Sequence, residues 1–418
     1  MRSVSVASIL GLALAVPADA HASPQDMFGY GARAVSMAGL GGTFVDDAGA
    51  VHANPGALSR ATERSFTLGF VGGGYSLWTQ RSSEAVSALA IERIRATTIG
   101  LTLPLPFGGV LRDRVALGLG FYTPTDVVVR GRLVRPEVPQ FLVLADRAQS
   151  VALQLGVGAH VLPGLRVGVG FAALAAIVGT VVVATDATGR ASARVDDQLV
   201  ASYAPVVGAS YDLGPFRLSA VFRGELVARF RITIEARDIG LPLPVFDIGG
   251  VAQYDPAQYA FEGAWVRSGW TLAAGTTFKS WSAYPGPLVA TTADSPAPPT
   301  PGFSNTWTVR AAAERRWQDR RSHWALRGGW FYEPTPAPLA VGRANYLDND
   351  RHAFTFGASV GTRTLGTYVS LDAYGQMHVL GSRTSVKDAA VSATNPGAPS
   401  IASGGTLLLL GLAATVTF

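Results

Sequence analysis

Histidine side chains are the first candidates for catalysis, and this chain has six of them. None belongs to a His-Glu-x-x-His zinc motif. Asp46 and Asp47 are adjacent carboxylates, but no further ligand follows at metal-binding spacing. His378 and Asp372 have the same parity, which leaves a lipid hydrolase as an alternative, although such pairs are more often structural. The sequence therefore predicts a protein that is not an enzyme and that has no catalytic residues, metal or cofactor; the histidines are His21, His52, His160, His323, His352 and His378.

Arginines are the main candidates for ligand binding. Arg223, Arg229 and Arg231 share one parity in one segment, and Arg310 and Arg327 lie in two others. A guanidinium in a low-dielectric site is suited to hold the carboxylate of an anionic ligand. We expect Arg223 or Arg310 to make such a contact if one exists. The alternative is structural pairing with acidic residues, for which the candidates are Glu225, Glu235, Glu314, Asp46 and Asp47.

Composition limits the class of protein that positions these residues. The chain has 418 residues, of which 48% are hydrophobic and only 15% charged, whereas soluble domains carry about 25% charged residues. Beyond the N-terminus it has no apolar run of about 18 residues, which a membrane helix needs. It contains no cysteine, so disulfides are excluded. Its net charge is +5 with two lysines, and no basic run suggests nucleic-acid binding.

The N-terminus has the features of a secretory signal. Arg2 is followed by a short apolar stretch, and small residues surround two cleavage positions, after Ala20 and after Ala22. We therefore expect residues 1–22 to be a signal peptide. The alternative, an inner-membrane anchor, would need a longer apolar run.

Strict alternation is the strongest structural signal. Between Arg217 and Glu235, every even position is apolar or glycine, and most odd positions are polar or charged. A period of two places the two sets on opposite faces of a strand. Membrane strands need about nine to eleven residues with apolar side chains outward and polar side chains inward. The run of nineteen residues predicts a membrane strand with its even positions facing lipid.

Similar segments recur along the chain and alternate with short and long connections. An even strand number and this alternation of connections are typical of bacterial outer-membrane barrels. The sequence therefore predicts an all-β fold, a barrel of fourteen antiparallel transmembrane strands from residue 65 to 418. The expected strands are 65–78, 94–105, 111–130, 148–161, 165–188, 199–213, 216–236, 257–266, 269–283, 304–316, 322–332, 351–361, 364–380 and 404–418.

Glycines and aromatic residues fit the same barrel. Many glycines fall on the inward parity, where they leave space for a passage or a plug; these are Gly118, Gly120, Gly156, Gly158, Gly168 and Gly170. The last residue, Phe418, ends an alternating strand and resembles the assembly signal of outer-membrane barrels. Other aromatics lie near expected strand ends or on the outward parity, as interfacial girdles do: Trp265, Trp270, Trp307, Trp324, Trp330 and Tyr332.

Residues 23–64 do not alternate and are rich in small residues. Their motifs resemble those of the outer-membrane long-chain fatty-acid and aromatic-hydrocarbon transporters, the FadL/TodX family. The resemblance rests on Asp46-Asp47-Ala48 and Asn54-Pro55-Gly56-Ala57-Leu58, with later matches at Trp281-Ser282-Ala283-Tyr284 and Asp348-Asn349-Asp350. The family commonly has Asn-Pro-Ala-Gly-Leu, so Gly56 and Ala57 are exchanged here.

The resemblance implies that residues 23–64 form a hatch inside the barrel, with Asp46, Asp47, Asn54, Pro55, Gly56 and Ala57 as its motif residues. It also implies a monomer in the outer membrane that takes up hydrophobic compounds by passive diffusion. The weaker ligand candidates are Arg223, Arg229, Arg310 and Arg327. Outer-membrane lipid, lipopolysaccharide and the barrel-assembly machinery are the expected partners. The alternatives are an enzymatic or structural barrel and a porin for polar solutes.

Overall fold

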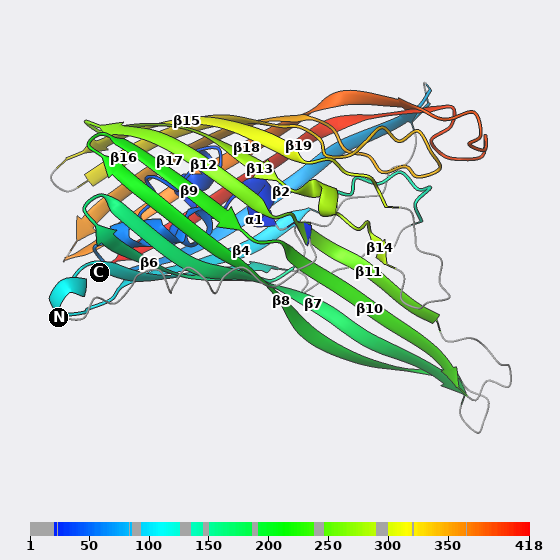
Figure 1. Ribbon diagram of the computed structural model, residues 1–418, viewed down its shortest axis with the longest axis horizontal. Coiled ribbons are helices and arrows are strands. Elements are labelled where there is room, and N and C mark those ends of the chain that lie inside the picture. The colour runs from blue at the N-terminus through cyan, green and yellow to red at the C-terminus, as the bar shows by residue number, and fades with distance from the viewer. Residues whose placement is uncertain are drawn as a thin grey trace, which may run out of the picture.

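Fourteen antiparallel strands close into a barrel, as the sequence predicts (Figure 1). The structure, a computed structural model, describes residues 21–22, 24–82, 84–85, 93–125, 135–144, 150–185, 191–237, 246–289, 300–319, 322–364 and 366–418. Strands that are consecutive in the wall pair with one another, and the last strand pairs with the first, with Leu410 opposite Gly72. This pairing of the last strand with the first closes the sheet on itself at that point.

Twelve of the wall strands are continuous and two are interrupted. The continuous strands are β2 (Ser65–Arg81), β4 (Ile94–Pro104), β5 (Val115–Pro124), β6 (Ala152–Leu162), β7 (Leu165–Thr185), β8 (Ala191–Leu213), β13 (Trp270–Lys279), β15 (Thr306–Gln318), β16 (Ser322–Glu333), β17 (Arg351–Thr364), β18 (Thr367–Val386) and β19 (Ser400–Thr417). The interrupted ones are β9 (Phe216–Arg223) with β10 (Leu226–Arg237), and β11 (Phe246–Asp255) with β12 (Gln258–Arg267). Two-residue strands β1 (His21–Ala22), β3 (Glu84–Ala85) and β14 (Leu288–Val289) add to the sheet.

Short turns gather at one end of the barrel with the C-terminus, and longer connections at the other (Figure 1). We call these the short-turn end and the long-loop end. Outward-facing residues are apolar and exposed, for example Leu218, Leu326 and Leu412, whose exposed fractions are 52%, 58% and 64%. Exposed tryptophans lie close to strand ends, Trp324 at the short-turn end and Trp307 at the long-loop end. The outer face is therefore suited to lipid.

One expected strand, 216–236, is not a single membrane strand. β9 pairs with β8 only as far as Arg223 opposite Val206. At the next position Pro205 accepts a hydrogen bond from Gly224 N (2.8 Å), but a proline has no N–H to return. Gly224 also packs on the proline ring, where a Cβ would lie 2.7 Å from Pro205 Cδ. The ladder between the two strands therefore stops here.

Beyond this break β10 leaves the wall and pairs in parallel with β7, from Arg231 opposite Val178 to Arg237 opposite Ala184. The expectation that Leu226 and Ala228 face lipid is wrong, because both are buried with residues of the inner faces of β4 to β8. The long connections that the expected strands imply, 189–198 and 237–256, are also wrong in extent. β8 begins at Ala191, and β11 occupies residues 246–255.

The N-terminal segment, residues 24–64, lies within the barrel between its walls (Figure 1). It contains α1 (Pro24–Phe28), α2 (Ala32–Ser36), α3 (Ala50–Ala53) and the 3-10 helix η2 (Pro55–Arg60). Glycines border these short helices, with Gly29 after α1 and Gly49 before α3. Gly31, with φ of 85°, precedes α2 and packs so closely on Gly49 that a Cβ would lie 2.9 Å from the Gly49 Cα. No helix among the described residues is long and apolar enough to cross a membrane.

Candidate functional site

Inward glycines of β6, β7 and β8 form the surface on which η2 rests. A Cβ at Gly168 would lie 2.2 Å from Gly56 N, and one at Gly158 would lie 2.3 Å from the Pro55 carbonyl oxygen. Gly118 is similarly covered by Leu58. The sequence left two uses for the inward glycines, space for a passage or space for a plug. At these positions the glycines make room for the N-terminal segment.

Asn54 fixes the turn that begins η2. Its side chain is fully buried, and its Nδ2 donates to the carbonyl oxygens of Gly42 and Ala209, both at 3.0 Å. Its Oδ1 accepts from Gly56 N at 2.9 Å. Pro55 occupies the first position of η2, where a missing N–H costs nothing. Asn54 therefore connects two parts of the segment to the wall, and Pro55, Gly56 and Ala57 are buried beside it.

Glu314 is the centre of a charged cluster at the short-turn end. Its carboxylate is inaccessible to solvent and accepts from Arg33 Nη2 at 2.7 Å and from Arg327 Nε at 2.8 Å. Arg316 Nε lies 2.9 Å away. Arg327 also pairs with Asp372, with its Nη1 2.8 Å from Asp372 Oδ1. We call these five residues the Glu314 cluster; through Arg33 it ties the N-terminal segment to the wall.

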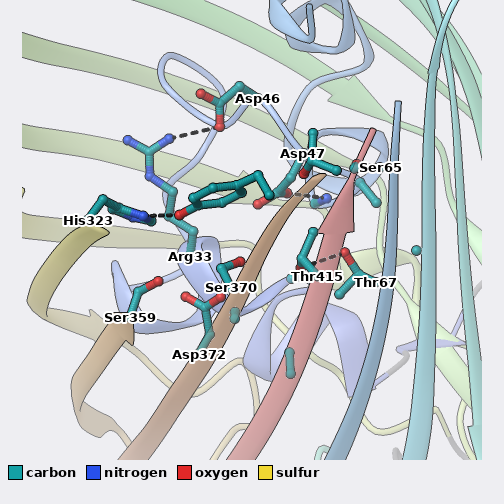
Figure 2. Close-up of a pocket in the computed structure, with 18 of the residues that line it drawn as sticks. Arg33, Asp46, Asp47, Ser65, Thr67, His323, Ser359, Ser370, Asp372 and Thr415 are labelled. Carbon is teal, nitrogen blue, oxygen red and sulfur yellow. Dashed lines mark hydrogen bonds and ion pairs between the residues drawn. The ribbon is translucent and has the colours of Figure 1, made fainter. Parts of the chain in front are cut away.

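The two expected hatch aspartates act within the segment. Asp46 pairs with Arg33 at 3.3 Å, and Figure 2 shows the Arg33 guanidinium pointing toward Asp46. Asp47 Oδ1 accepts a hydrogen bond from Gly49 N at 2.6 Å. Partial burial opposes ionisation of Asp46, but the charge of Arg33 outweighs it and lowers the pKa of Asp46. Burial and the charge of Asp46 raise the pKa of Asp47.

A second buried charged group lies at α1. Lys279 is fully buried and donates to Asp26 of α1 at 3.0 Å and to Glu333 at 2.8 Å. Arg351 Nη2 pairs with the other oxygen of Glu333, and Gln258 donates to Asp26. Sequence reasoning missed these residues. A signal existed, because a lysine is rare in this chain and Lys279 falls on an inward parity.

The expected ligand arginines are occupied by protein groups. Arg223 Nη2 donates to the carbonyl oxygen of His52 at 2.5 Å, and Arg310 Nη1 donates to that of Ala38 at 2.6 Å. Arg327 belongs to the Glu314 cluster. Arg229 follows the break after β9 and is exposed. The structure thus brings Arg223, Arg310 and Arg327 to the N-terminal segment or its wall contacts, whereas Arg229 is exposed.

Another part of the lumen carries a continuous group of apolar side chains. Buried residues of β4, β18 and β19 form one cluster with Met27, Phe28 and Val35 of the N-terminal segment and with residues of the outer loops. We call it the apolar column; on the wall it includes Ile94, Leu380, Ile401, Leu407 and Leu409. In β19, Leu407 and Leu409 face inward while Leu408 and Leu410 face outward, so both faces are apolar. This departs from the polar lumen of a water-filled barrel.

A small cavity of about 30 Å³ lies where the column meets α1. It is lined mainly by apolar and aromatic side chains, among them Phe28, Val71 and Leu409. The Gln25 amide and the Tyr122 hydroxyl, both buried near or at this cavity, have no hydrogen-bond partner in the described part of the chain. Its volume is about that of a single water, so a larger ligand requires the surrounding elements to move.

A larger polar cavity of about 550 Å³ opens beside the Glu314 cluster and is shown in Figure 2. Ser359, Asp372 and His323 all line it. Ser359 lies in a Gly-x-Ser-x-Gly sequence, but this sequence is inside strand β17 and not at a strand-to-helix turn. Asp372 is paired with Arg327, and His323 Nδ1 with the Tyr368 hydroxyl. The arrangement is therefore not that of a serine hydrolase.

We expect the seating of the N-terminal segment to weaken in mild acid through His52. Gln154 Nε2 lies 3.0 Å from His52 Nδ1, and because an amide nitrogen only donates, the ring accepts and is neutral. Burial and the charge of Arg223 hold the pKa of His52 well below its usual value, Arg310 adds to this and Asp26 opposes it. The unfolded state then binds more protons below about pH 6.5.

The contribution of His52 to stability should therefore fall as the pH drops below about 6.5, by at most about 1.4 kcal/mol per pH unit. Urea unfolding in lipid vesicles between pH 7.5 and 5.5 measures this slope. The variant His52→Gln should lose it. Equal slopes in both proteins would assign the pH dependence to other groups.

The architecture matches solved transporter structures over nearly the whole chain. A FadL homologue from Pseudomonas aeruginosa superimposes with a TM-score of 0.64 at 14% identity, covering 96% of this chain and 99% of that chain. The toluene transporter TodX of P. putida gives 0.54 at 12% identity, with 94% and 99% covered. The toluene transporter TbuX of Ralstonia pickettii gives 0.53 at 14%, with 93% and 98% covered.

No family model matches the chain, and no curated protein matches it at a significant level. Identities of 12 to 14% establish a shared fold. The chain therefore has the barrel fold of these transporters, the fold that its sequence motifs led us to expect.

Proposed function

We propose that this barrel carries hydrophobic small molecules across the outer membrane by passive diffusion. The apolar column is the observation that supports this most directly. It extends from the outer loops, through Leu407 and Leu409 of the wall, to Phe28 of the N-terminal segment. A channel for polar solutes needs a water-filled lumen with polar walls, and a column lined by leucine, isoleucine and phenylalanine is a poor path for such solutes.

The solved structures with the same fold include two described as toluene transporters. A shared fold alone does not fix a function, so the proposal depends on the column and gains support from these neighbours. Fatty acids and aromatic hydrocarbons both belong to the chemical class that the column would accept.

We propose that the N-terminal segment is a hatch that closes the short-turn end. It is held there by η2 on the glycine surface and by Arg33 in the Glu314 cluster. The N-terminal signal peptide in this proposal would direct the chain through the inner membrane; cleavage after Ala20, one of the two expected positions, keeps β1 (His21–Ala22) in the sheet. Phe418 would serve assembly. The short-turn end then faces the periplasm. Outer-membrane lipid and lipopolysaccharide would surround the apolar outer face.

Whole-cell uptake tests the function. Cells that carry the protein in the outer membrane should accumulate a radiolabelled long-chain fatty acid or toluene faster than cells without it. The uptake of a sugar of similar mass should be unchanged. Faster uptake of the sugar, with steady large conductance in planar bilayers, would indicate a porin instead.

We expect the variant Arg310→Ala to alter the uptake of a fatty acid and of a neutral hydrocarbon by the same factor. Arg310 lies over the Phe331 ring at 4.7 Å and donates to Ala38, so its role is to hold the N-terminal segment. Competition between the two substrates in the same cells gives the ratio directly. A loss for the fatty acid alone would instead assign a carboxylate contact to Arg310.

A further inference from the structure

A four-residue turn of the loop between β5 and β6 enters the barrel mouth at the long-loop end. This turn, Phe141–Leu144, consists of Phe-Leu-Val-Leu and is closed by Leu144 N donating to the Phe141 carbonyl oxygen at 3.1 Å. Phe141, Val143 and Leu144 expose 2%, 4% and 0% of their surface. Apolar side chains outside any strand are seldom buried so completely, since loops usually run over the surface.

The turn lies between two apolar groups and contributes to both. Phe141 and Leu144 belong to the apolar column, with Leu347 and Ile401. Val143 belongs to an aromatic cluster formed by Tyr254, Trp281, Tyr284 and Phe303, and Leu142 packs against that cluster. Trp281 stacks on Tyr254 with ring centroids 4.9 Å apart. The turn thus fills the space where the column would otherwise open toward the long-loop end.

Within the described part of the chain, the turn is attached through the residue before it. Gln140 forms a β-bridge with Tyr346 of the loop between β16 and β17, in which Gln140 N donates to the Asn345 carbonyl oxygen and Leu347 N donates to that of Gln140. Asn345 also holds the residues before Gln140, because its N donates to the Pro136 carbonyl oxygen and its Nδ2 donates to that of Glu137. Among the described residues, the four apolar residues have no hydrogen bond to groups outside the turn and are held by packing, which an apolar ligand can replace.

We propose that the turn Phe141–Leu144 occupies a ligand site at the outer end of the apolar column, and that a hydrophobic ligand binds there by displacing it. This inference rests on the proposed function. The turn supplies to the column and to the aromatic cluster the aliphatic and aromatic contacts that an alkyl chain or an aromatic ring would supply. A ligand binds only when the turn is displaced from this site, so ligand binding shifts the equilibrium toward the state with the turn displaced.

A reversible lock tests the displacement, and the chain has no cysteine to interfere. The double variant Gln140→Cys with Tyr346→Cys joins two β-bridge partners, which are close enough for a disulfide. When oxidised, it should lower whole-cell uptake of a radiolabelled fatty acid at least tenfold, and dithiothreitol should restore the rate. The control, Thr67→Cys with Thr415→Cys, cross-links two wall strands whose hydroxyls are 2.9 Å apart and should transport normally in both states.

The outcomes separate the two proposals. If the wild type transports neither fatty acid nor toluene, the proposed function fails. If the wild type transports and the oxidised lock transports equally well, the function stands and the displaced turn is overturned.

A second variant tests the competition without a cross-link. Phe141→Ala with Leu144→Ala weakens the turn's own packing, so the apparent Kd of a fluorescent fatty acid for the solubilised protein should fall on the order of tenfold. If the two side chains were simply ligand contacts, the same variant would raise the Kd, and that result would overturn the proposal.

Discussion

Replacing Gly168 with valine is expected to turn a closed barrel into a conducting pore. The nearest atoms to a Cβ at this position belong to the N-terminal segment, with Gly56 N at 2.2 Å and the Pro55 carbonyl carbon at 2.3 Å. These are backbone atoms of η2, so they cannot turn away as a flexible side chain would. η2 must therefore lift from the wall by more than an ångström. Valine is a good strand residue, so the wall itself should still form.

Planar-bilayer recording measures the result. Wild-type protein should show little steady conductance, and Gly168→Val should show large, long-lived openings. Trypsin should also cut the variant faster at Arg33 or Arg60, which are buried or partly buried when the segment is seated. The matched control is Gly72→Val on β2, where an added Cβ meets nothing within 4 Å. A silent Gly168→Val pore would mean that the segment does not depend on this surface for closure.

The wall of the barrel could be read from the sequence because lipid imposes a simple rule. Every outward position must be apolar, so alternation reports both the strand and its face. The number of wall strands, most of their positions and the outward Leu408, Leu410 and Leu412 follow from that rule. The inward side of the glycines was also predictable, although alternation left open whether a passage or a plug occupies the space that they leave.

The break at Gly224 could not be predicted from alternation. The even positions remain apolar through Ile234, yet the strand leaves the wall because Pro205, on the neighbouring strand, removes a donor. The cause therefore lies in a residue that is distant in sequence. The same limit applies to the inward face of β19, where Leu407 and Leu409 gain meaning only beside Phe28.

Charged partners inside the barrel were only partly readable. Glu314 was among the expected acidic partners, and it pairs with Arg327 across adjacent strands. Its contact with Arg33 joins residues 281 positions apart, and no local pattern encodes such a distance. Likewise, Arg223 and Arg310 have the inward parity that was expected, but parity does not reveal that their partners are backbone carbonyls of the N-terminal segment.

Removing the carboxylate of Glu314 is expected to be the most destabilising single change in the charged side of the lumen. Glu314→Ala leaves Arg33 and Arg327 buried with fewer acceptors, although Asp46 and Asp372 still compensate part of their charge. Breaking a buried ion pair by deleting one partner costs about 3–5 kcal/mol. Because of the remaining acids, we expect about 3 kcal/mol, measured by urea unfolding in lipid vesicles.

An exposed ion pair in the same protein provides the matched control. Glu63 lies 2.8 Å from Arg363, with side chains that are 47% and 57% exposed, so Glu63→Ala should cost less than about 1 kcal/mol. The combination Glu314→Ala with Arg33→Met should recover part of the loss, because it removes one uncompensated charge while keeping a side chain of similar length. That recovery would assign the energy to desolvated charge and not to lost packing around Glu314. If Glu314→Ala costs no more than Glu63→Ala, the Glu314 cluster does not anchor the N-terminal segment, and η2 on its glycine surface must hold the segment alone.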